Sequence, residues 1–387
     1  MPEGRSGKGG GAGDGASPLA LFDAYPHLRE RVAYEPLGTY PTPVTPMPDL
    51  ARALGGGEIW IKRDDRSAGL YGGNKVRKLE LVLADALRRG HRRVWTVGGF
   101  GSHQVLANSL YARALGLDCA AVVFPQPVTD HVRRVLHEIA ETDCDLVPAY
   151  RMVTVPVAAA RLVARYALRD GRVPLQVPPG ASSALGALGY VSAALELVEQ
   201  IRRGECPRPE VVFTAMGSMG TAAGLIVGFR LAGLDLPVRC VRVVVAALAP
   251  VSRLAALCRA TAGLLGRHGV EVPGTFRSSD MIVEPDCVGE GYGYVTPAGQ
   301  VAVAAARADG IQLETTYTGK AMAGLMAHVR QRRVGWHNVL FWNTFNSMDH
   351  APRMSGAEAA ARLPAALRPV LLRPVLPGAS GEKKARQ

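Results

Sequence analysis

The amino-acid sequence predicts an α/β protein with two domains, built on open, twisted parallel sheets that carry helices on both faces. Short β-branched runs, such as residues 58–62 and 93–97, alternate with Leu- and Ala-rich stretches whose apolar residues recur at helical spacing. Glycine-rich turns directly follow several of these runs. Because strand–helix–strand units cross over right-handed, the strands should be parallel and ligands should bind at their carboxyl ends.

The elements follow in order along the chain. The predicted strands are residues 58–62, 93–97, 120–124 and 210–214, and the predicted helices are residues 75–90, 109–115 and the segment that ends at Leu231. Both chain ends lack this pattern, since residues 1–17 are rich in Gly, Ser and Ala and residues 376–387 are similar. We expect a disordered leader and a frayed tail.

The composition fits a soluble globular protein, because the 387-residue chain is 48% hydrophobic and 20% charged. A formal net charge of +12 raises the question of nucleic-acid binding. The basic residues, however, form short Arg groups inside helix-like sequence, and a solvated basic face is the favoured interpretation. No nucleic-acid partner is expected, and the charge suits an anionic cofactor and an amino-acid carboxylate.

The six cysteines are widely spaced, without a C-x-x-C pair or a histidine cluster nearby. This spacing indicates neither a zinc site nor a disulfide framework, so no metal is expected and a reducing compartment fits best. The first residues lack the apolar core of a signal peptide, and no apolar run is long enough to span a bilayer. We expect a cytoplasmic protein without a membrane partner.

One glycine-rich turn, residues 214–224, follows a predicted strand and opens a helix. Its central residues are Gly217, Ser218, Met219, Gly220 and Thr221. Small residues allow successive backbone N–H groups to converge, and the helix dipole adds positive charge, so this turn is suited to a phosphate. Tight packing of the strand against the helix is an equally open explanation.

A second turn places Lys75 at the start of a predicted helix. Gly72 and Gly73 free the backbone to turn, and Asn74 is a candidate N-cap. A lysine beside the positive helix terminus is shifted toward its neutral, nucleophilic form, which forms Schiff bases. From this segment alone, a solvated first-turn lysine is the commoner alternative.

A third turn, residues 98–104, also lies between a strand and a helix. The backbone N–H groups of Ser102, His103 and Gln104 are placed to hold a carboxylate. The alternative is a capped helix start, in which Ser102 satisfies backbone donors and His103 is a polar loop residue.

Together these segments resemble the family of pyridoxal-phosphate enzymes that contains 1-aminocyclopropane-1-carboxylate deaminase and D-cysteine desulfhydrase. The resemblance extends from about Leu37 to Phe345. It rests on residues 62–65, 72–80, 184–190, 291–293 and 317–324. It implies the tryptophan-synthase-β-like fold (fold type II), pyridoxal 5'-phosphate as cofactor and a homodimer. It also fits a large domain of residues 18–77 plus 191–375 and a small domain of residues 78–190.

The resemblance assigns cofactor-binding roles to matching positions. Lys75 would carry the cofactor as a Schiff base, and Asn74 would approach its ring. The backbone of residues 217–221 (Gly217, Ser218, Met219, Gly220 and Thr221) would bind its phosphate, and the Thr344 hydroxyl would meet the pyridine nitrogen.

It also assigns substrate-binding and catalytic roles. Ser102, His103 and Gln104 would bind the substrate carboxylate, and Ser102 could take part in acid–base steps beside Lys75. Tyr292 and Tyr317 would face the substrate, one of them near its leaving group. The implied reaction is β-elimination with deamination of a small amino acid, as in a desulfhydrase. The alternatives are β-replacement, 1-aminocyclopropane-1-carboxylate deamination, or cofactor binding without turnover.

Several positions depart from the family's usual pattern. His103 stands where Asn is usual, and Met219 replaces a glycine of the phosphate turn. Phe345 and Asn346 replace two glycines after Thr344. Ser183 ends a stretch, residues 181–183, where Gly-Ser-Asn is common. In addition, Thr318 stands where the cyclopropane deaminases tend to have an acid, which makes ring opening the less favoured reaction. These departures leave the substrate open.

Overall fold

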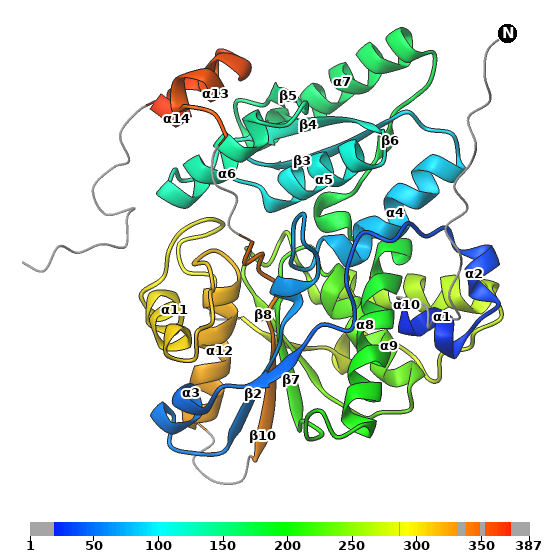
Figure 1. The fold of residues 1–387 in the computed structure, drawn as a ribbon, viewed down its shortest axis with the longest axis vertical. Coiled ribbons are helices and arrows are strands. Elements are labelled where there is room, and N and C mark those ends of the chain that lie inside the picture. Colours follow the sequence, from blue (N-terminus) through cyan, green and yellow to red (C-terminus); the bar gives the residue numbers. More distant parts are fainter. Residues whose placement is uncertain (1–18, 286, 332–336, 349–352, 373–387) are drawn as a thin grey trace, which may run out of the picture.

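The computed structural model of the protein describes residues 19–285, 287–331, 337–348 and 353–372 (Figure 1). The predicted leader, residues 1–17, and the predicted tail, residues 376–387, lie outside the described residues.

The larger sheet has six strands in the order β1-β2-β10-β7-β8-β9. These are β1 (Val44–Pro46), β2 (Glu58–Lys62), β7 (Val211–Met216), β8 (Val238–Arg242), β9 (Ile282–Glu284) and β10 (Asn338–Trp342). Neighbouring strands are parallel, except that β1 pairs antiparallel with β2. The predicted parallel sheet is confirmed, and the single antiparallel strand lies at its edge.

The smaller sheet has four parallel strands in the order β5-β4-β3-β6. These are β3 (Arg93–Gly99), β4 (Asp118–Phe124), β5 (Asp145–Pro148) and β6 (Leu175–Gln176). The strands predicted at residues 93–97 and 120–124 are therefore present, and each extends by two residues.

Helices cover both faces of the larger sheet (Figure 1). One face carries α8 (Ala184–Arg202), α9 (Gly220–Leu231) and α10 (Val251–Arg267), and the other carries α3 (Pro48–Ala53), α11 (Pro297–Ala308) and α12 (Thr318–Gln331). Because side chains alternate along a strand, Trp342 of β10 joins the apolar core under α8 and α9, whereas Phe341 joins the core under α12.

The smaller sheet is enclosed in the same way. The helices α4 (Val76–Arg88), α5 (His103–Ala114) and α6 (Asp130–Ala140) share one apolar core with it, and α7 (Val155–Asp170) covers the opposite face. The structure corrects the helix predicted at residues 109–115, which begins earlier, at His103. Most of its first two turns is buried, including Gln104 and Asn108, so the apolar periodicity of a half-exposed helix is missing there.

Two C-terminal helices, α13 (Gly356–Arg362) and α14 (Arg368–Leu372), pack against α6 beside the smaller sheet (Figure 1). Leu363, Leu367 and Leu371 join the apolar core of α4 and α5. This packing differs from the expected grouping of residues 191–375 with the large domain.

The remaining short helices are α1 (Ala20–Ala24), α2 (Leu28–Arg31), η1 (Asp64–Arg66), η2 (Met152–Thr154), η3 (Pro179–Ala181) and η4 (Ser278–Asp280).

One helix among the described residues, α8, has the length and composition to cross a membrane. Of its 18-residue apolar stretch, 72% is buried inside the structure. Its apolar character is explained by its central position, because it packs against α4, α9 and α10.

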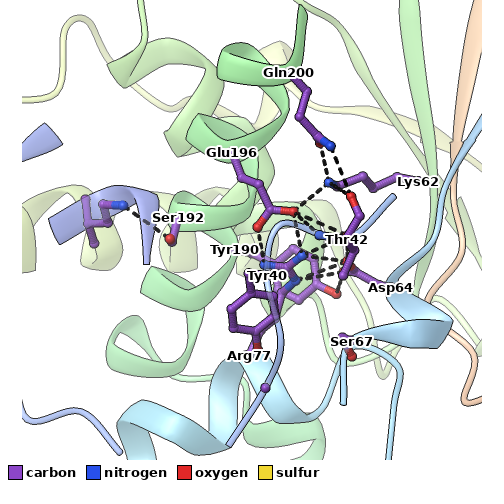
Figure 2. A network of polar contacts seen from close by, with 12 residues as sticks. Tyr40, Thr42, Lys62, Asp64, Ser67, Arg77, Tyr190, Ser192, Glu196 and Gln200 are labelled. Atoms are coloured by element: carbon purple, nitrogen blue, oxygen red, sulfur yellow. Dashed lines mark hydrogen bonds and ion pairs between the residues drawn. The ribbon is translucent and has the colours of Figure 1, made fainter. Parts of the chain in front are cut away.

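A buried network of charged side chains joins the larger sheet to the helices (Figure 2). Arg77 of α4 donates hydrogen bonds to Asp64 at 2.8 Å and to Glu196 of α8 at 2.9 Å. Lys62, the last residue of β2, donates to Glu196 at 2.5 Å. Trp342 of β10 donates to Asp64 at 2.7 Å. Two strands and two helices therefore meet at one cluster.

The network balances its charges. Lys62 and Arg77 supply two positive charges, and Asp64 and Glu196 supply two negative charges. Although burial opposes ionisation, the charges of Arg77 and Lys62 lower the pKa of Glu196 to about 2. Glu196 therefore stays ionised at neutral pH.

We predict that Arg77→Leu lowers the free energy of unfolding by about 3–5 kcal/mol, because it leaves Asp64 and Glu196 buried without their partner. Urea denaturation followed by circular dichroism measures this change. The control is Arg88→Leu at the end of the same helix, whose side chain is 53% exposed and pairs with Asp85. Equal effects of the two substitutions would contradict a structural role for the network.

Candidate active site

A pocket of about 600 Å³ lies where turns of the two sheets meet. It is lined by the turns after β3, β7 and β10 and by the segment before α4. Every predicted site residue lines it except Gly220. The lining members are Asn74, Lys75, Ser102, His103, Gln104, Gly217, Ser218, Met219, Thr221, Tyr292, Tyr317 and Thr344. The carboxyl ends of parallel strands therefore form the site, as expected.

Lys75 lies at the N-cap position of α4, one residue before the predicted position in the first turn. Its Nζ donates a hydrogen bond to Asn74 Oδ1 at 2.6 Å. Burial lowers the pKa of Lys75 to about 8, against the opposing charge of Glu314. A substantial fraction of this amine is therefore neutral near pH 8, and a neutral amine is what attack on a carbonyl carbon requires.

The turn between β7 and α9 forms a cradle for an anion. The first N–H groups of α9 have no acceptors within the helix, and their dipole is directed into the pocket. The Gly220 N–H is already occupied outside the helix, because it donates a hydrogen bond to Ser182 Oγ at 3.1 Å. Gly180, with φ 67°, lies so close that a Cβ there would be 1.9 Å from Ser218 Oγ. The segment of Gly180 and Ser182 therefore packs tightly against the turn and holds it in place.

Met219 replaces a glycine at a position that favours glycine, since its φ is 70°. A left-handed conformation costs a non-glycine residue about 1–2 kcal/mol. The Met219 side chain is buried in the core of the larger sheet, and burial of a Met side chain contributes about 1.5–3 kcal/mol. Packing thus offsets the backbone strain while the backbone N–H is kept.

Lys78 is a further lysine beside the phosphate turn, and it was not among the predicted site residues. Its Nζ donates to Thr221 Oγ1 at 3.3 Å, and Asn74 Nδ2 donates to the same oxygen at 3.0 Å. Burial, followed by the charge of Lys75, lowers the pKa of Lys78 well below its usual value. The carboxylates of Asp64 and Glu196 pair instead with Arg77 and Lys62, and among the described residues no ion pair involves Lys78. Lys78 follows Lys75 by three residues, so the two lysines lie on one face of the helix, and this spacing could have predicted that Lys78 lies near the site.

The turn after β3 forms the second binding surface. Ser102 is the N-cap of α5, and its Oγ accepts a 3.4 Å hydrogen bond from the Val105 N–H. Gln104 is buried, and within the described chain its side-chain amide has no hydrogen-bond partner at either Oε1 or Nε2. A buried amide that lines a pocket without a protein partner is suited to a polar ligand.

His103 is already engaged at both ring nitrogens. Its Nδ1 is hydrogen-bonded to the Tyr71 hydroxyl, and its Nε2 lies 2.8 Å from His131 Nε2. Burial, then the neighbouring charges of His131 and Lys75, lowers the pKa of His103 well below its usual value. Because both ring nitrogens are engaged, the predicted contact of His103 with a carboxylate would be made by its backbone N–H. Sequence reasoning found neither Tyr71 nor His131.

Two of the departures from the family pattern, His103 and Phe345, are in contact, and Asn346 follows directly in the chain. The ring of Phe345 packs edge-on against His103, with 5.8 Å between the ring centroids. Asn346 Oδ1 accepts a 2.8 Å hydrogen bond from the Gly72 N–H, and the Thr344 carbonyl accepts one from the Asn74 N–H at 3.2 Å. The turn after β10 thus holds the segment that carries Lys75.

The two predicted tyrosines meet over the pocket, with their hydroxyls 2.6 Å apart. Tyr292 lies between Gly291 and Gly293, whose φ values of 145° and 83° few other residues adopt. Lys320 anchors this loop by donating to the Val288 carbonyl at 2.7 Å. Burial raises the pKa of Tyr292, and it raises that of Tyr317 well above its usual value, so both hydroxyls stay protonated.

Comparison with known proteins identifies the class. The family of pyridoxal-phosphate dependent enzymes matches residues 36–344. The chain belongs to this family. It is 36% identical over 315 residues to the D-cysteine desulfhydrases of Salmonella typhi and of Salmonella enteritidis PT4, covering 79% of this chain and 91% of each relative.

Solved structures agree. The crystal structure of a 1-aminocyclopropane-1-carboxylate (ACC) deaminase homologue is 29% identical with a TM-score of 0.70, covering 90% of this chain and 100% of that one. An L-serine ammonia-lyase from Rhizomucor miehei, 20% identical with a TM-score of 0.56, covers 85% of this chain and 98% of its own, and it shows the fold alone. The predicted fold, family and cofactor are confirmed: this is a pyridoxal-phosphate-dependent enzyme.

The residues present fit pyridoxal phosphate. The Lys75 amine suits its aldehyde, because burial keeps a fraction of that amine neutral. The α9 terminus suits its phosphate, and so does the buried amine of Lys78, because an adjacent anion stabilises the protonated form of a lysine. Bound cofactor would thus supply the negative charge that favours protonation of Lys78.

We predict that Lys78→Gln raises the dissociation constant of pyridoxal phosphate by about 10-fold to 100-fold, because a hydrogen bond between charged groups contributes about 1.5–3 kcal/mol. Titration of the apoenzyme, followed by cofactor absorbance, gives this constant. Arg89→Gln, at the exposed end of the same helix, is the control. Unchanged affinity in Lys78→Gln would place the phosphate elsewhere.

Proposed function

We propose that this enzyme catalyses β-elimination with deamination of a small amino acid that bears a β-leaving group. The products are pyruvate, ammonia and the leaving group. One observation carries the proposal: the partly neutral amine of Lys75 faces a pocket between an anion cradle and a turn suited to a carboxylate. The similarity to D-cysteine desulfhydrases supports it.

Each residue has a task in this scheme. Pyridoxal phosphate, when bound, supplies the electron sink for the reacting carbon. Ser102 and Gln104, together with the His103 backbone N–H, hold the substrate carboxylate, and the Lys75 amine removes the proton from Cα. The Tyr292–Tyr317 pair faces the leaving group and keeps water from it.

Thr344 favours elimination over transamination. We propose that its neutral hydroxyl meets the pyridine nitrogen, where it does not enforce protonation of the ring. Prompt loss of a leaving group is then favoured over a long-lived carbanion. The cofactor-binding residues are, in this proposal, Lys75, Asn74, Lys78, Thr344 and the backbone of residues 217–219 and 221.

Cyclopropane ring opening is the less favoured alternative. Thr318, at the position where an acid is expected for that reaction, hydrogen-bonds with Glu314. The Glu314 carboxylate also accepts the N–H groups of Thr316, Tyr317 and Thr318 at 2.6–2.8 Å. It is occupied as the cap of α12 and is not available as an acid.

We also propose a cytoplasmic homodimer with no nucleic-acid or membrane partner. None of the six cysteines, all of which lie among the described residues, forms a disulfide, which supports a reducing compartment. The proposed domains are residues 18–77 plus 191–375 and residues 78–190; α13 and α14, which belong to the first range, pack against the second domain. Light scattering on the purified holoenzyme tests the dimer, and a monomer mass would contradict it.

The reaction is tested by measuring pyruvate released from D- and L-cysteine, β-chloroalanine, serine and cysteate. We expect release from at least one of the first three, and the absence of pyruvate from all substrates would overturn the proposal. A product that requires an added nucleophile indicates β-replacement, and 2-oxobutanoate from 1-aminocyclopropane-1-carboxylate indicates the deaminase.

The pH dependence of cofactor attachment follows from Lys75. Because the neutral amine is the nucleophile and its pKa is about 8, the reconstitution rate of apoenzyme with pyridoxal phosphate should fall as the pH drops below about 8. It should level off above that value. Stopped-flow absorbance measures the rate, and Lys75→Ala should show no attachment at any pH. A flat profile would contradict the assignment.

A further inference from the structure

The pocket continues outward, past the cofactor and carboxylate turns, to an apolar mouth. We define the mouth as Met152, Leu248 and Tyr294 with Pro125 and Pro127, all of which line the pocket. The first three are 50%, 48% and 43% exposed. They come from three separate segments, which follow β5, β8 and β9 in the chain.

This arrangement indicates a binding surface. Large apolar side chains that are singly exposed are ordinary, but a group that surrounds one concavity marks a ligand site. Inside the mouth, the neutral rings of Phe124, His103 and Phe345 line the pocket. Among the described residues that line the pocket, Lys75, Glu314 and Arg253 are charged, and of these Arg253 of α10 is exposed. The five residues that define the mouth are uncharged and mostly apolar, so they suit an apolar group.

The tyrosine pair indicates what kind of bond breaks. Tyr292 and Tyr317 are protonated but weak acids, because burial raises the pKa of both hydroxyls. An alkoxide needs a strong proton donor to leave, whereas a thiolate is a much weaker base and leaves with little help. The site is therefore better matched to a carbon–sulfur bond than to a carbon–oxygen bond.

We propose that the mouth binds the S-substituent of an S-alkyl or S-aryl cysteine, which makes thioether amino acids the substrate class of this site. The inference rests on the proposed β-elimination. Lys75 takes the Cα proton, a Cα–Cβ double bond forms, and the C–S electron pair leaves on sulfur, which then gains a proton. With hydrolysis, R–S–CH₂–CH(NH₃⁺)–COO⁻ and water give RSH, pyruvate and ammonium.

The test compares kcat/KM of the holoenzyme for cysteine, β-chloroalanine, S-methylcysteine and S-benzylcysteine, each as both enantiomers, by pyruvate release. We expect S-benzylcysteine to exceed S-methylcysteine by about tenfold or more, the usual discrimination of an apolar pocket. Leu248→Ser and Met152→Ser, on separate segments of the mouth, should each remove about tenfold for S-benzylcysteine. The ratio of kcat/KM for S-benzylcysteine to kcat/KM for cysteine should therefore fall by about tenfold in each variant.

The matched control is Leu168→Ser on α7, whose side chain is 88% exposed and does not line the pocket. It should change no substrate. If the mouth variants lower all substrates equally, or change the oligomeric state, the mouth does not bind the substituent. If pyruvate forms from cysteine or β-chloroalanine but not from S-benzylcysteine, the thioether class is wrong while β-elimination stands. Absence of pyruvate from every substrate would overturn both.

Discussion

The hydrogen-bonded ion pair between Arg77 and Asp64 is the interaction on which the rest of the structure depends (Figure 2). Asp64 also accepts from Tyr190 of α8 and Trp342 of β10, so one carboxylate fixes two helices and the end of a central strand. Arg77 follows Lys75 by two residues. The charge-balanced cluster therefore helps to set the position of the reactive amine. The turn after β10 holds the same segment through hydrogen bonds to the N–H groups of Gly72 and Asn74.

Exclusion of water sets the chemistry of the site. Burial is the largest cause of the lowered pKa values of Lys75, Lys78 and His103 and of the raised values of Tyr292 and Tyr317. Every one of these shifts favours the neutral form. A pocket with neutral bases and neutral hydroxyls lets a bound anionic cofactor dominate the local charge.

Local backbone chemistry made much of the fold and of the site predictable. The strands around β2, β3, β4 and β7, the glycine-rich turns and Lys75 are all encoded within a few neighbouring residues. Tyr71 and His131 were missed because their contact with His103 bridges 32 and 28 residues of sequence. The periodic pattern located α5 only at residues 109–115, because the buried first turns of the helix lack a periodic signal, and its start was indicated only by the possible cap at Ser102. The packing of α13 on α6 depends on tertiary contacts that no local pattern contains.

The Tyr71–His103–His131 chain has a consequence for redesign of this wall. Two Nε2 atoms at hydrogen-bonding distance share a single proton, so the tautomer of one histidine fixes that of the other. Replacing His103 with the asparagine usual in the family would remove the histidine ring that both Tyr71 and His131 contact. Such residues contribute non-additively. A redesign of this part of the pocket should therefore replace Tyr71, His103 and His131 together rather than one position at a time. It must also take account of Phe345, which packs against His103.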